Sequence, residues 1–87
     1  MRIKKEFILR EIAGEYILIP TGTTTQEFNG LITINDVAAF VWKNIEKVNS
    51  VDELISMVLD EYDVDEDVAR NDIEEFIQQL KKADMIA

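Results

Sequence analysis

Apolar residues in the first third of the chain gather in short runs bounded by turn signals, a pattern that is typical of β-strands. Residues 7–12 and 16–20 are rich in β-branched and aromatic side chains and predict two strands. The turn between them, residues 13–15, contains a glycine, which tolerates a positive φ. A polar connector, residues 21–27, then leads to a third predicted strand over residues 28–34.

After the third strand the apolar spacing changes to the period of amphipathic helices. Asn35 and Asp65 each stand where a helix N-cap is expected. Ser50 and Glu53 form a capping box, in which each side chain can bond the other's backbone N–H. We therefore predict three helices, followed by a tail at residues 85–86 that folds back on the core. The predicted buried faces are Val37, Phe40, Val41, Ile45 and Val48 in the first helix, Val51, Leu54, Ile55, Val58, Leu59 and Tyr62 in the second, and Ala69, Ile73, Phe76, Ile77 and Leu80 in the third.

Three strands followed by three helices predict an α+β domain with a three-stranded antiparallel sheet and helices packed on one sheet face. The short link over residues 62–65 suggests a helix-turn-helix corner, so a winged helix-turn-helix is the favoured architecture. With 87 residues, the chain is expected to form one domain, residues 1–87.

The net charge of −9 lies entirely in residues 50–87, which carry twelve acidic and three basic side chains. Such a surface repels phosphate backbones and anionic lipids and attracts basic peptides. The third predicted helix has only Arg70, Lys81 and Lys82 against five acids, so a DNA-binding regulator is the less favoured alternative. We expect neither nucleic acid nor membrane as a partner.

Catalytic and metal chemistry find little support in the composition. The chain has no Cys and no His, which removes the commonest zinc ligands and the commonest general base. A calcium loop starting at Asp63 would place Val68 where the turn needs Gly. We expect no catalytic residue, no metal and no cofactor. No signal peptide or membrane span is recognisable, which favours a cytoplasmic protein.

The third predicted strand favours polypeptide binding instead. Residues 29–33 carry no charge and no Pro to block pairing, so an extended peptide could add there as a further strand. The edge could equally be covered by a helix, with Gly30 serving only as a bulge. An open edge could also pair with a second copy, which makes a homodimer possible.

Several segments together resemble the PqqD family. They are Phe28-Asn29-Gly30, the run from Ile34 to Trp42, Ser50 to Leu54, Glu61 to Asp65, and Asp72 to Phe76 followed by Leu80. Two turn positions depart from the family, which often has Gly where Lys47-Val48-Asn49 and Asp84 stand here.

The resemblance implies a domain that binds the leader of a ribosomally made precursor peptide and presents it to a separate modifying enzyme, often a radical S-adenosylmethionine enzyme. It also implies that the leader adds as an antiparallel strand beside the third strand and lies against the third helix. A general peptide or protein adaptor is the alternative. The implied peptide-binding residues are Asn29, Gly30, Leu31, Ile32, Thr33, Asp72, Glu75, Phe76 and Gln79.

Overall fold

The computed structural model describes residues 1–27 and 30–87, and its sheet has the strand order β1-β2-β3. Strands β1 (Phe7–Ile12) and β2 (Glu15–Pro20) form an antiparallel hairpin. The hairpin turns at Ala13 and Gly14, which both have positive φ, as a tight two-residue turn requires. Strand β3 (Ile32–Ile34) runs antiparallel to β2, with Ile32 opposite Leu18.

The third strand is shorter than predicted. Gly30 has a φ of 97° and Leu31 lies outside the strand with 60% of its surface exposed. A positive φ interrupts extended backbone, so β3 begins only at Ile32. Residues 28 and 29 of the predicted strand lie outside the described residues.

The connector predicted over residues 21–27 contains a short helix, α1 (Thr24–Glu27). Thr24 is buried, and its hydroxyl oxygen accepts a hydrogen bond of 2.8 Å from the Glu6 N–H. The Thr21 N–H donates to the Glu6 carbonyl at 2.9 Å. These contacts with the segment before β1 explain why a polar stretch is folded here.

The three predicted helices are confirmed as α2 (Asp36–Asn44), α3 (Val51–Glu61) and α4 (Glu66–Lys82), with a 3₁₀ turn, η1 (Ile45–Lys47), after α2. The N-caps are also confirmed, because Asn35, Ser50 and Asp65 each accept a backbone N–H. Only one of the two hydrogen bonds predicted for the capping box forms. Ser50 accepts from the Glu53 N–H, but the Glu53 carboxylate accepts from the Asn49 N–H.

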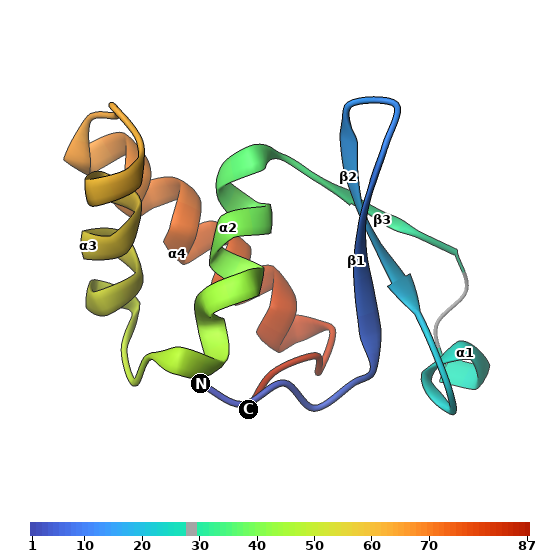
Figure 1. Cartoon of the computed structure of the whole chain (residues 1–87). Helices are drawn as coiled ribbons and strands as arrows, with labels where there is room; N and C mark the ends of the chain where they lie inside the picture. Colours follow the sequence, from blue (N-terminus) through green and yellow to red (C-terminus); the bar gives the residue numbers. More distant parts are fainter. Residues whose placement is uncertain (28–29) are drawn as a thin grey trace.

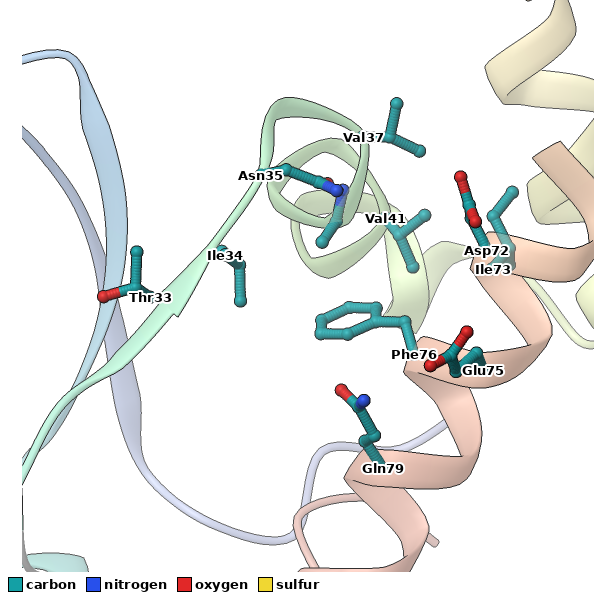
Figure 2. A pocket seen from close by; sticks show the side chains of 11 residues that line it. Thr33, Ile34, Asn35, Val37, Val41, Asp72, Ile73, Glu75, Phe76 and Gln79 are labelled. Atoms are coloured by element: carbon teal, nitrogen blue, oxygen red, sulfur yellow. The ribbon is translucent and has the colours of Figure 1, made fainter. Parts of the chain in front are cut away.

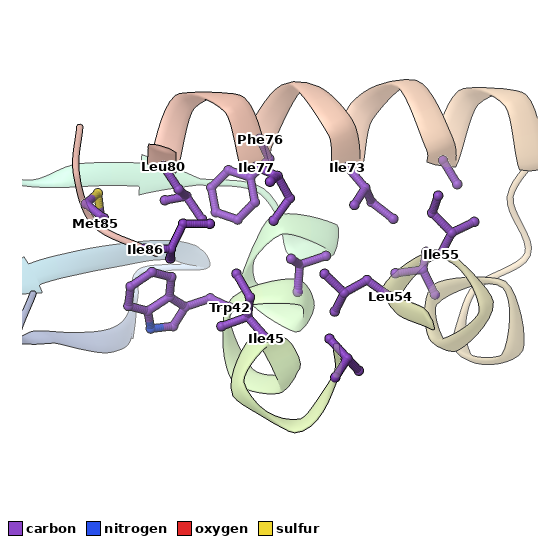
Figure 3. Close-up of a cluster of buried hydrophobic side chains, with 14 of the residues drawn as sticks. Trp42, Ile45, Leu54, Ile55, Ile73, Phe76, Ile77, Leu80, Met85 and Ile86 are labelled. Carbon is purple, nitrogen blue, oxygen red and sulfur yellow. The ribbon is translucent and has the colours of Figure 1, made fainter. Parts of the chain in front are cut away.

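Helices α2, α3 and α4 lie to one side of the sheet (Figure 1), and the buried side chains of the hydrophobic core pack among these elements (Figure 3). Leu18 on β2 is fully buried against the helices, and Trp42 on α2 is 7% exposed. The Trp42 ring meets that of Phe7 edge to face, with 6.1 Å between the centroids. The arrangement confirms the predicted α+β class. The described segments contain no helix long and apolar enough to cross a membrane.

The predicted return of the tail to the core is confirmed. Met85 and Ile86 are buried, and the Lys4 N–H donates to the Met85 carbonyl at 2.8 Å. The turn before them is a Schellman motif, with bonds from the Met85 N–H to the Leu80 carbonyl and from the Asp84 N–H to the Lys81 carbonyl. Asp84 adopts a φ of 58°, which is the conformation that Gly favours at this position.

Candidate functional site

A groove runs between strand β3 and helix α4, with the start of α2 closing one end (Figure 2). Its volume is about 270 Å³. Small-molecule sites usually begin at about 300 Å³, so the groove suits a few side chains of a larger ligand better than a whole small molecule. The lining residues are Thr33, Ile34, Asn35, Val37, Ala38, Val41, Asp72, Ile73, Glu75, Phe76 and Gln79.

Helix α4 brings its lining residues together through helical spacing. Asp72, Phe76 and Gln79 lie four and three residues apart, so they share one face. Phe76 is 8% exposed, and in Figure 2 its ring points from α4 toward Ile34 of β3. The same helix face therefore serves both the core and the floor of the groove.

Strand β3 contributes an open edge. It pairs with β2 on one side, and within residues 1–27 and 30–87 no strand pairs with its other side. Successive residues of a strand direct their backbone N–H and C=O groups to alternate sides. At least one residue of Ile32–Ile34 therefore presents both groups at the open edge.

The groove is apolar at its floor and acidic at its rim. Val41, Ile73 and Phe76 are buried, whereas the carboxylates of Asp72 and Glu75 are exposed. None of the lining residues is basic. Arg70, the cation nearest to Asp72 along α4, is engaged by Asp52 at 2.9 Å, and by Glu74 and Glu66 at 3.8 and 4.0 Å.

The structure brings together five of the nine residues that the family resemblance implied for peptide binding, namely Thr33, Asp72, Glu75, Phe76 and Gln79. Ile32 belongs to β3 but does not line the groove. Gly30 and Leu31 precede the strand and are exposed. Asn29 lies outside the described residues.

Six lining residues were not assigned to the site from the sequence: Ile34, Asn35, Val37, Ala38, Val41 and Ile73. A signal for them was present, because Val37, Val41 and Ile73 belong to predicted apolar helix stripes. Helical spacing alone predicts that all of these stripes belong to the core. Ala38 belongs to none of the predicted stripes, so no apolar period marks it as a groove residue.

Metal-ligand geometry is not found at this groove. Across the part of the chain that the structure describes, no three acidic side chains gather as metal ligands could. Asp65, from the candidate calcium loop, instead caps α4 by accepting the N–H groups of Asp67 and Val68.

The fold and the groove define a small α+β domain with a winged-helix arrangement, in which an open strand edge faces an apolar helix groove. The model of a protein family described as coenzyme PQQ synthesis protein D (PqqD) matches residues 15–86. The chain belongs to this PqqD family, so the resemblance noted in the sequence is confirmed.

A solved structure, "TbiB1 in Complex with the TbiA(beta) Leader Peptide", shares the fold with a TM-score of 0.70 at 20% sequence identity. The alignment covers 99% of this chain and 94% of the TbiB1 chain, so the similarity extends over the whole domain. No curated protein sequence gives a significant match.

Proposed function

We propose that this protein binds the leader segment of a ribosomally synthesised precursor peptide and presents it to a separate modifying enzyme, such as a radical S-adenosylmethionine enzyme. The observation that carries the proposal is the open edge of β3 facing the groove of α4. Membership of the PqqD family supports it. So does the shared fold with TbiB1, a protein solved with a leader peptide.

Binding would occur by strand addition. The leader would lie antiparallel beside β3 and exchange backbone hydrogen bonds with Ile32–Ile34, which tolerate many sequences. Side chains on one face of the leader would enter the groove and provide selectivity. Ordering a disordered leader offsets much of the contact energy, so the affinity should be roughly micromolar.

The protein would act without chemistry of its own, in the cytoplasm, where precursor peptides are made. Its contribution would be to hold the leader in an extended form and so deliver the rest of the peptide to the enzyme. The open edge of β3 could also pair with a second copy, in which case the leader and the second copy would compete for one surface.

Titration by NMR tests the proposal. Leader segments of any short precursor peptides that are found encoded near this chain's gene would be synthesised and added to isotope-labelled protein. The largest amide shifts should fall in residues 31–34 and on α4 around Phe76. Shifts that cluster on the Ala13-Gly14 turn or on α3 would show that the proposed groove is wrong.

Light scattering on the same samples measures the oligomeric state. If the edge self-pairs, the dimer should dissociate as leader is added.

A further inference from the structure

The polar rim of the groove is different at its two ends. Asp72 lies at the end where β3 leads into α2, near Val37, whereas Gln79 lies at the opposite end (Figure 2). Contacts near the chain ends also place the Gln79 end of the groove beside the start of β3 and the Asp72 end beside its finish. The end of α4 is tied to the chain start through the bond between Lys4 and Met85, and β1 begins opposite Pro20, beyond the Leu18–Ile32 pair.

A strand added to β3 would therefore meet a charge gradient along its length. The existing sheet is antiparallel throughout, and purely antiparallel sheets are over-represented among known folds. An antiparallel strand would enter beside Asp72 and leave beside Gln79. Its N-terminal part would face carboxylates, and its C-terminal part would face a neutral amide.

The spacing of side chains along α4 matches the spacing of side chains along an added strand. Asp72 and Phe76 are four residues apart on α4, which corresponds to a rise of about 6 Å. Side chains two residues apart on a strand share one face and lie about 6.6 Å apart. An apolar side chain that packs over Phe76 would therefore place the side chain two residues earlier beside Asp72, with Glu75 on the same helix face.

We infer that this groove selects peptides in which a Lys or Arg stands two residues before an apolar anchor. The inference rests on the proposed strand addition and names the peptide class that it takes. Asp72 and Glu75 form no ion pair with any described residue and are exposed, so their charge is available to a ligand. The buried floor formed by Val41, Ile73 and Phe76 accepts the anchor.

A displayed library of random 12-residue peptides, sorted on the intact protein, tests the inference. Selected peptides whose NMR footprint covers residues 32–34 and 72–79 should be enriched in Lys or Arg two positions before an aliphatic or aromatic residue. From one such binder, three synthetic peptides follow: the parent, a version with Lys replaced by Gln, and a version with the anchor placed before the Lys. The two altered peptides should bind about twofold to fivefold more weakly at low salt, the range for an exposed ion pair.

Matched variants assign the effect to its residues. Asp72→Asn and Glu75→Gln should weaken the parent peptide but leave the Gln-substituted peptide unchanged. Asp63→Asn removes the same charge from the exposed turn between α3 and α4 and should change neither affinity.

Peptides that bind at the groove without a basic residue at that position, or equal binding of the order-swapped peptide, would overturn the inference alone. A library that gives no groove-binding peptide would overturn strand addition and the inference together.

Discussion

Proline substitutions at Ile32 and Thr33 should give opposite results if a peptide adds to the edge of β3. Neighbouring residues direct their N–H groups to opposite sides of a strand, so one of these two donors faces β2 and the other faces the open edge. Proline removes the donor and fixes φ, and it is tolerated on edge strands where the lost N–H faces solvent. Ile32→Ala and Thr33→Ala keep the donor and serve as position-matched controls.

The loss of stability and the loss of peptide affinity can be estimated separately. Loss of the inward donor leaves a carbonyl of β2 unpaired, which costs up to about 1–3 kcal/mol if that carbonyl is shielded from water. For a domain of this size, each kcal/mol lowers the melting temperature by about 4–8 °C. Loss of the outward donor should leave the melting temperature near that of the Ala control. It should weaken peptide binding by about 0.5–1.5 kcal/mol, which is about twofold to thirteenfold in affinity.

Circular dichroism melts and fluorescence anisotropy with a labelled groove-binding 12-residue peptide measure both effects. The expected result is one variant with reduced stability and one stable variant with reduced affinity. The reasoning is refuted if both variants match their Ala controls in affinity, or if both lose affinity at full stability, because adjacent donors cannot both face the peptide.

Two other substitutions test the parts of the fold that support the groove. Trp42→Ala should lower the free energy of unfolding by about 3–5 kcal/mol, measured by urea denaturation, because a buried ring is removed. Well below its melting temperature the variant should bind peptide normally, since Trp42 does not line the groove. A variant that is folded but does not bind peptide would contradict this. At Asp84, the hydrogen bond from Lys4 and then its charge lower the carboxyl pKa, so the pair stabilises the fold above the ordinary carboxyl pKa and stops doing so as pH falls. Asn also tolerates a positive φ, so Asp84→Asn should melt below wild type at about pH 7, and this difference should shrink as pH falls below the ordinary carboxyl pKa. Asp84→Ala should melt lower still across this pH range because of backbone strain, and pH-independent differences would refute the ion pair.

The helices were predictable because each carries both an apolar period and a local start signal. Asn35, Ser50 and Asp65 act within three residues of their own position, so no tertiary information is needed to recognise them. The short helix at Thr24 was not predictable in this way. It depends on a bond from the Glu6 N–H across 18 residues, and such a partner leaves no mark in the local pattern.

The residues of the site also fall into two groups, those that a local pattern predicts and those that depend on distant parts of the chain. The groove residues of α4 follow from helical spacing once the facing strand is known, and the resemblance to PqqD proteins supplied that strand. The contribution of α2 was missed because apolar periodicity indicates that Val37 and Val41 face away from water. It does not indicate that they line a groove. The start of β3 was misplaced because the positive φ of Gly30 is set by the chain path, whereas the residue type only permits it.

The two sides of the groove should differ in how far they are formed before a peptide arrives. Ile73 and Phe76 are 1% and 8% exposed within the longest helix, and their backbone bonds lie inside that helix. Strand β3 has three residue pairs with β2 and an exposed Leu31 before it. Sparse burial and few backbone bonds allow local opening at low free energy, whereas core helices open only with the whole domain.

Amide hydrogen exchange should show this difference directly. In the free protein, the amides of Ile73 and Phe76 should exchange slowly, and the edge-facing amide of β3 should exchange at a rate near that of unstructured peptide. A saturating 12-residue peptide should move only the β3 amide from unprotected to protected, because its N–H gains a partner that the sheet lacks. Free-state exchange of the α4 amides as fast as that of β3 would mean that the groove forms only with its ligand. An edge amide that stays unprotected in the complex would mean that the peptide occupies the groove without extending the sheet.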